Sequence, residues 1–78
     1  IMAKDASFKM LIDMCEKVGW DKGITELERI VFQNENMQAD LFAGTPSQVK
    51  QAQKLSKIII KQNISIGRLK QYRSERGL

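Results

Sequence analysis

Gly44-Thr45-Pro46-Ser47-Gln48 decides how the two halves of this 78-residue chain are joined. Gly44 suits the end of one helix, and Thr45 suits the N-cap of the next. Pro46 favours the first helical position, and Gln48 can complete a capping box with Thr45. The stretch therefore predicts a tight turn between two helices, which favours an antiparallel pair or a corner.

Two amphipathic helices are predicted before this turn. The first spans about 6–18, with Asp5 as its N-cap, Gly19 as its stop, and residues 1–4 as a frayed start. Its apolar side chains recur at helical spacing, at Phe8, Leu11, Ile12, Cys15 and Val18. The second helix is expected to begin at the capping box of residues 25–28 and to run to about 43. Its polar middle, residues 33–36, leaves a break or kink open.

After the turn, a third helix is predicted over 46 to about 61. Its buried side chains would be Val49, Ala52, Leu55, Ile58 and Ile59. Its lysines recur every three or four residues, so they should form a ridge on one face: Lys50, Lys54, Lys57 and Lys61. Asn63-Ile64-Ser65 is predicted to break this helix, and a basic helix should follow over about 66–76.

This order of elements over 55–76 resembles the helix-turn-helix of small DNA-binding regulators. In that family the turn commonly reads Gly-apolar-Ser/Thr, and here it reads Asn63-Ile64-Ser65. The family's inward positions fall on apolar or aromatic residues of this chain: Ile58, Ile59, Ile64, Leu69 and Tyr72. Gln62 and Gly67 depart from the family's pattern. The resemblance implies a regulator of the kind that bacteria, phages or plasmids carry, acting in transcription and working as a homodimer.

The resemblance also implies which residues contact double-stranded DNA. Arg68 or Lys70 would read guanine edges in the major groove, and Gln71 would read adenine. Gly67 would allow close approach to the DNA or would merely loosen the helix, and the lysines of the preceding helix could contact phosphates. The full candidate set for nucleic-acid binding is Lys57, Lys61, Ser65, Gly67, Arg68, Lys70, Gln71 and Arg73.

The charge of the chain is divided unevenly between its halves. Residues 1–44 contain five basic and eight acidic residues, whereas residues 45–78 contain eight basic residues and Glu75 alone. A half this basic attracts polyanions, and nucleic acid is the commonest. Two alternatives stay open: the basic half is simply a solvated lysine-rich surface, or its partner is an acidic protein or a membrane surface.

Several function classes are disfavoured by what the sequence lacks. A single cysteine, Cys15, and the absence of histidine argue against a disulfide and a zinc site. No nucleophile with an activating base is visible, so we predict no catalytic residue, metal or cofactor. No apolar run has the length of a membrane span, and no signal peptide is visible, so a cytoplasmic protein is expected.

The prediction is thus a single all-α domain over 1–78, a compact bundle of three to four helices. An acidic scaffold (about 5–43) would carry a basic half (about 45–76) whose C-terminal part is helix-turn-helix-like. The alternative is a protein-interaction module without nucleic acid, in which residues 46–76 form one helix. Its coiled-coil-like seam would run through Ala52, Leu55, Ile59, Gln62, Ile66 and Leu69. A weaker resemblance, over 37–77, is to the two-helix protein of the bacterial large ribosomal subunit, which has more arginine and no extra N-terminal helix.

Overall fold

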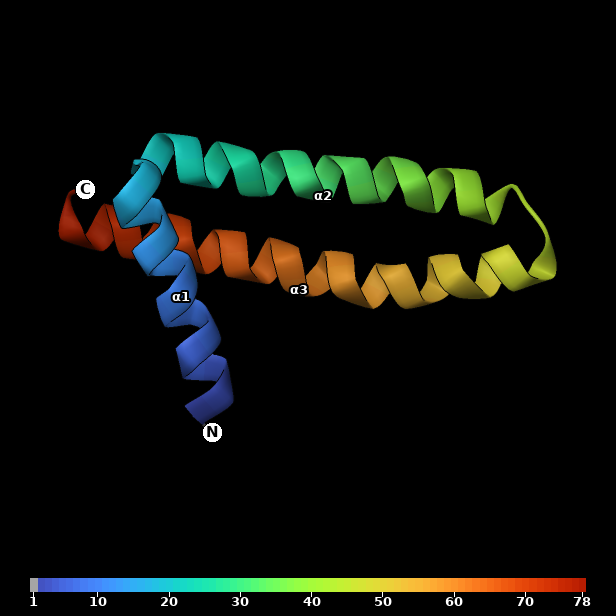
Figure 1. Ribbon diagram of the computed structural model, residues 1–78, viewed down its shortest axis with the longest axis horizontal. Helices are drawn as coiled ribbons and strands as arrows, with labels where there is room; N and C mark the ends of the chain where they lie inside the picture. Colours follow the sequence, from blue (N-terminus) through green and yellow to red (C-terminus); the bar gives the residue numbers. More distant parts are fainter. Residues whose placement is uncertain (1) are drawn as a thin grey trace.

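The computed structural model describes the backbone of residues 2–78 and the side chains of residues 7–78, and its described part contains three helices and no strand. These are α1 (Met2–Val18), α2 (Trp20–Phe42) and α3 (Pro46–Arg76). Helices α2 and α3 lie antiparallel as a long hairpin, and α1 crosses α3 near the end that holds the C-terminus (Figure 1). The all-α prediction is confirmed.

The turn at residues 44–48 has the predicted geometry. The backbone N–H of Gln48 donates to Thr45 Oγ1 at 3.3 Å, and the backbone N–H of Thr45 donates to Gln48 Oε1 at 2.9 Å. Pro46 opens α3. These contacts satisfy backbone donors that the first turn of a helix leaves without partners, so α3 begins at a defined residue.

The first two helices begin earlier than predicted. Helix α1 already includes Met2, so the frayed start is wrong for residues 2–4; Ile1 and the side chain of the proposed N-cap Asp5 lie outside the described residues. Helix α2 begins at Trp20 instead of Thr25. Gly19 ends α1 as predicted, and its φ of 99° lets the chain turn sharply into α2.

Packing between α1 and α2 explains why α2 begins before the predicted capping box. Gly23, in the first turns of α2, lies directly against Cys15 of α1, and both are buried. A Cβ atom on Gly23 would lie 2.8 Å from Cys15 Sγ and 3.1 Å from Cys15 Cα. The close contact needs Gly23 in a helix that starts at residue 20, and this tertiary constraint prevails over the local capping signal.

Replacing Gly23 with alanine is therefore expected to lower the free energy of unfolding by about 1–3 kcal/mol, because the new methyl group overpacks the contact with Cys15. Gly67 provides the matched control, since it lies inside α3 and a methyl group at that position would meet nothing within 4 Å. Gly67→Ala should raise stability by about 0.5–1 kcal/mol through helix propensity. Urea unfolding followed by circular dichroism measures both. An equal change in the free energy of unfolding for Gly23→Ala and Gly67→Ala would contradict the close contact between Gly23 and Cys15.

Helix α3 does not break at Asn63-Ile64-Ser65, so the predicted helix-turn-helix is wrong. The helix is continuous over 31 residues, and no non-glycine residue in the described chain has a positive φ. The alternative seam is confirmed: Ala52, Ile59, Ile66 and Leu69 are buried, and Leu55 and Gln62 are partly buried. By contrast Ile58 and Ile64, which the helix-turn-helix would turn inward, are 49% and 58% exposed.

The long partner helix explains why α3 continues. Ile59 and Ile66 are buried against Ile24 and Val31 of α2. Burying an aliphatic side chain stabilises by about 1.5–3 kcal/mol, whereas Asn, Ser or Gly in a helix costs about 0.5–1 kcal/mol each. The apolar stripe therefore outweighs the poor local propensity of residues 63–67.

Polar side chains of α2 also contribute to the hairpin. The predicted kink at residues 33–36 is absent, because α2 is one helix. Asn34 Nδ2 donates to Gln62 Oε1 at 3.0 Å, and Gln38 Nε2 donates to the carbonyl oxygen of Ala52 at 3.1 Å. These bonds set the register of the two helices: Asn34 lies opposite Gln62, and Gln38 lies opposite Ala52.

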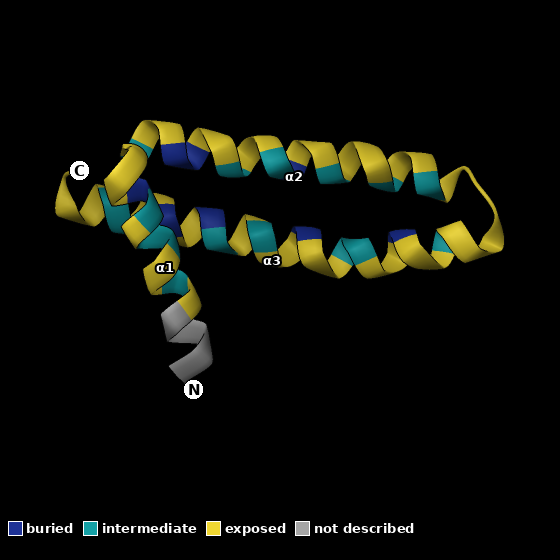
Figure 2. Cartoon of the chain, in the orientation of Figure 1, coloured by how far each residue is buried: buried dark blue, intermediate teal, exposed yellow. Residues whose placement is uncertain are grey.

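The molecule is extended, so the expected compact bundle needs correction. Its buried residues form a thin stripe between the helices, while most of the other residues are exposed (Figure 2). The radius of gyration is 14.7 Å, and the extents are 46 × 28 × 18 Å. A compact chain of this length would have a radius of gyration of about 11.5 Å. Two long helices and one crossing helix do not close around a central core.

Candidate nucleic-acid interface

Five cationic side chains of α3 lie along one exposed face of the helix. They are Lys50, Lys54, Lys57, Lys61 and Arg68, and all five are exposed. At 100° per residue, their positions fall within about 60° of one another around the helix, over a length of about 27 Å. We call this face the basic ridge. It lies on the side of α3 opposite the buried stripe that contacts α2.

Among the described side chains, no carboxylate forms an ion pair with a cation of the basic ridge. Residues 46–74 contain no acidic residue. Among the side chains of residues 7–78, the ion pairs join Arg29 to Glu26, Lys70 to Glu28, and Arg73 to Asp21, and none includes a ridge residue. The ridge thus presents five positive charges to solvent.

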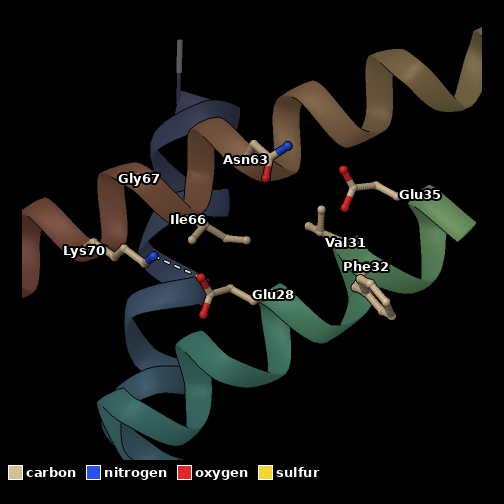
Figure 3. A pocket seen from close by; sticks show the side chains of 8 residues that line it. All are labelled: Glu28, Val31, Phe32, Glu35, Asn63, Ile66, Gly67 and Lys70. Atoms are coloured by element: carbon tan, nitrogen blue, oxygen red, sulfur yellow. Dashed lines mark hydrogen bonds and ion pairs between the residues drawn. The ribbon is translucent and has the colours of Figure 1, made fainter.

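Two of the predicted site residues face elsewhere. Lys70 Nζ lies 3.0 Å from Glu28 Oε2 (Figure 3), and Arg73 Nη1 lies 2.5 Å from Asp21 Oδ1. Arg73 Nε also donates to the carbonyl oxygen of Leu78 at 2.8 Å. These side chains connect α3 with the acidic α2 and with the C-terminus. Such exposed pairs contribute about 0–1 kcal/mol each.

The eight predicted site residues therefore do not share one surface. Lys57, Lys61 and Arg68 belong to the basic ridge, with Ser65 and Gln71 at its borders. Gly67 and Lys70 line a groove between α2 and α3 on another side of the helix (Figure 3). Arg68 and Lys70 point about 160° apart in a continuous helix, so one groove of a duplex cannot receive both.

Helix α1 meets the basic ridge near its C-terminal end. The Arg68 guanidinium carbon lies 4.0 Å from the centre of the Phe8 ring, a cation–π contact that holds this side chain in place. One open cavity of about 540 Å³ is bordered by Ser7, Phe8 and Leu11 of α1 and by Lys61, Ile64, Ser65 and Arg68 of α3. Its lining thus combines two cations and two hydroxyl groups, which suit a phosphate oxygen, with three apolar or aromatic side chains.

The contributions of Ser7 and Phe8 could not be found from the sequence, because they depend on how α1 crosses α3. Lys50 and Lys54 were visible as part of a lysine ridge, but the resemblance to a helix-turn-helix drew attention to residues after 61. Only a continuous helix places Arg68 in line with the four lysines.

Aromatic packing fixes α1 against the end of the hairpin. Trp20 stacks on Tyr72 with ring centroids 5.7 Å apart, and Phe8 meets the same ring edge-on at 6.2 Å. The Arg76 guanidinium carbon lies 4.3 Å from the centre of the Tyr72 ring. The cluster positions Phe8 beside Arg68 and thereby couples α1 to the ridge.

Metal binding, thiol reactivity and membrane insertion have little support in the described part of the chain. No group of three His, Cys, Asp or Glu side chains there could hold a metal ion. Burial raises the pKa of the Cys15 thiol, which disfavours the reactive thiolate. The hydrogen bond from Arg29 lowers the pKa of the Glu26 carboxyl, which keeps that carboxylate ionised on the surface of α2. None of the helices in this part has both the length and the apolar character to span a membrane.

No protein-family model matches this chain, and neither a curated protein nor a solved structure shows significant similarity to it. The chemistry of its surface is therefore the basis for assigning a function.

Proposed function

We propose that this chain is a non-enzymatic nucleic-acid-binding protein that contacts the phosphates of double-stranded DNA through the basic ridge. The supporting observation is the alignment of five cations on one exposed face of a continuous helix, outside every described ion pair. Cationic side chains that meet DNA phosphates release condensed counterions, which is the main source of affinity in sequence-independent binding.

The length of the ridge suits a duplex. At 3.4 Å of axis per base pair, 27 Å corresponds to about eight base pairs. Lysine contributes a point charge on a flexible stem, so four of the five ridge residues can adapt to phosphates without requiring a base sequence. Arg68, held by Phe8, is the ridge side chain with a planar, bidentate donor set.

Sequence reading by a helix-turn-helix is not part of this proposal, because α3 has no second, separate recognition helix. Contacts to phosphate position a protein on DNA without specifying a site. An accessory protein that coats DNA, bends it or recruits another protein to it fits this surface better than a regulator that recognises one operator sequence.

Titration of a random-sequence duplex, followed by fluorescence anisotropy, tests the proposal. Five phosphate contacts give a log–log salt slope of about −4.5, so affinity should fall about 500-fold between 50 and 200 mM salt. Single-stranded DNA and double-stranded RNA of equal length serve as comparisons. Absence of binding at the lower salt concentration, or binding that salt does not weaken, would overturn it.

The exposed apolar side chains of the hairpin favour a second role, contact with another protein chain. These side chains, which include Phe32 and Met37 of α2 and Ile60 of α3, are distinct from the cations of the basic ridge, so the two roles do not exclude each other.

A further inference from the structure

Two hollows meet beside Leu11, where α1 crosses α3 (Figure 1). The first is the cavity of about 540 Å³ between α1 and α3, and the second, of about 320 Å³, is lined by all three helices. Leu11, Lys61 and Ser65 line both hollows, so the two form one continuous groove. We call it the α1 groove. Its two parts have the size of small-molecule sites.

The part of the α1 groove that reaches α2 is mainly aliphatic. Besides the three shared residues, its lining consists of Leu27, Ile30, Ile58, Gln62 and Ile66. Gln62 Oε1 already accepts a hydrogen bond from Asn34 Nδ2 at 3.0 Å, so this part offers few free polar groups. An alkyl chain placed here would gain about fourfold in affinity for each CH₂ group that it buries.

The part of the α1 groove between α1 and α3 contains its positive charge. Lys61 lies where the two hollows meet, and Arg68 lies farther along the first hollow. Neither cation belongs to an ion pair among the described side chains, and no carboxylate there lines either hollow. Arg68 can donate to both oxygens of a carboxylate, and Lys61 adds a second positive charge.

The lining favours an alkyl chain over a nucleobase. Among the described side chains that line the groove, Phe8 is the only aromatic one. The Arg68 guanidinium covers one face of its ring at 4.0 Å, and Tyr72 meets the ring edge-on with centroids 6.2 Å apart. Nucleobases bind by stacking on open aromatic faces. Aliphatic side chains instead suit a linear chain, and residues 58–68 extend over about 15 Å of helix axis.

We propose that the α1 groove binds a single-chain alkyl anion, a linear acyl chain with a carboxylate head group. The chain packs against Leu11 and Ile58, and the carboxylate meets Lys61 and Arg68. Burial of the chain supplies most of the affinity, and the two cations select the charge of the head group. Although both cations also belong to the basic ridge, this inference does not depend on DNA binding.

Titration with decanoate below its micellar concentration tests the proposal. In ¹H–¹³C correlation spectra, the methyl signals of Leu11, Ile58 and Ile66 should shift with decanoate concentration. Isothermal titration calorimetry should give about 15-fold weaker binding for octanoate, because two fewer CH₂ groups are buried. Decyltrimethylammonium, which has a similar chain and the opposite charge, should bind at least about tenfold more weakly than decanoate.

Ile58→Ser with Lys61→Gln should weaken decanoate binding more than about tenfold, because it removes an apolar contact and a cation. Both side chains are exposed, so circular dichroism should show unchanged helix content. The matched control is Phe32→Ser with Lys70→Gln, one apolar residue and one lysine from the groove on another side of the hairpin. It should leave the dissociation constant within about twofold.

Four results would overturn the proposal. They are the absence of decanoate binding below the micellar concentration, equal affinities for decanoate and decyltrimethylammonium, methyl shifts confined to residues outside the α1 groove, and equal losses in the two double variants.

Discussion

Replacing Ile64 with proline is expected to lower the free energy of unfolding by about 3 kcal/mol or more. Position 64 lies in the interior of α3, where its backbone N–H donates to the carbonyl oxygen of residue 60 in the helical pattern. Proline removes that donor, and its ring clashes with the same carbonyl group. The predicted turn at residues 63–65 would tolerate proline at far lower cost, so this substitution separates the two structures directly.

The control for this prediction is Ile64→Ala, which removes the same side chain without changing the backbone. The difference in the free energy of unfolding between the two variants then isolates the contribution of the helix backbone, because both variants lose the contacts of the Ile64 side chain. Urea unfolding, followed by far-ultraviolet circular dichroism at one protein concentration, measures both. A difference below about 1 kcal/mol would mean that α3 is not continuous at residue 64 in solution.

Replacing Lys54 and Lys57 together with glutamine is expected to reduce the affinity for duplex DNA about 50-fold near 0.1 M salt, because two of five phosphate contacts are lost. The salt slope should fall from about −4.5 to about −2.7. Both side chains are exposed and outside every described ion pair, so the fold should be unaffected.

Lys70→Gln with Arg73→Gln is the matched control, because it changes the net charge of the chain equally. These two side chains pair with Glu28 and Asp21 on the side of α3 that faces α2. We expect less than about a threefold loss of affinity. Equal losses in the two variants would indicate attraction by net charge alone, and a larger loss in the control would place the binding face where the helix-turn-helix resemblance put it.

Local features of the structure follow directly from the sequence. The hairpin turn depends on Thr45, Pro46 and Gln48, which interact only with one another and with adjacent backbone. The stop at Gly19 depends on one residue that adopts a positive φ at low cost. Because these contacts involve neighbours in the chain, their residue types and spacing suffice to predict them.

The candidate site was only partly predictable. The lysine ridge could be seen in the spacing of Lys50, Lys54, Lys57 and Lys61, since that spacing is a property of any helix. Its extension to Arg68 requires α3 to continue through residues 63–67, which have poor helix propensity. The separation of Lys70 from the ridge requires, in addition, the position of Glu28 on a second helix.

The sequence by itself thus determined the helical class, the turn at residues 44–48 and the excess of positive charge in the second half, because each depends on composition or on contacts between neighbours. Only the tertiary structure decided that α2 starts at Trp20 and that α3 continues past Asn63. Both outcomes depend on side chains distant in sequence, Cys15 against Gly23 and the apolar stripe of α2 against Ile59 and Ile66. There, burial between helices contributes more free energy than the local propensities that oppose it.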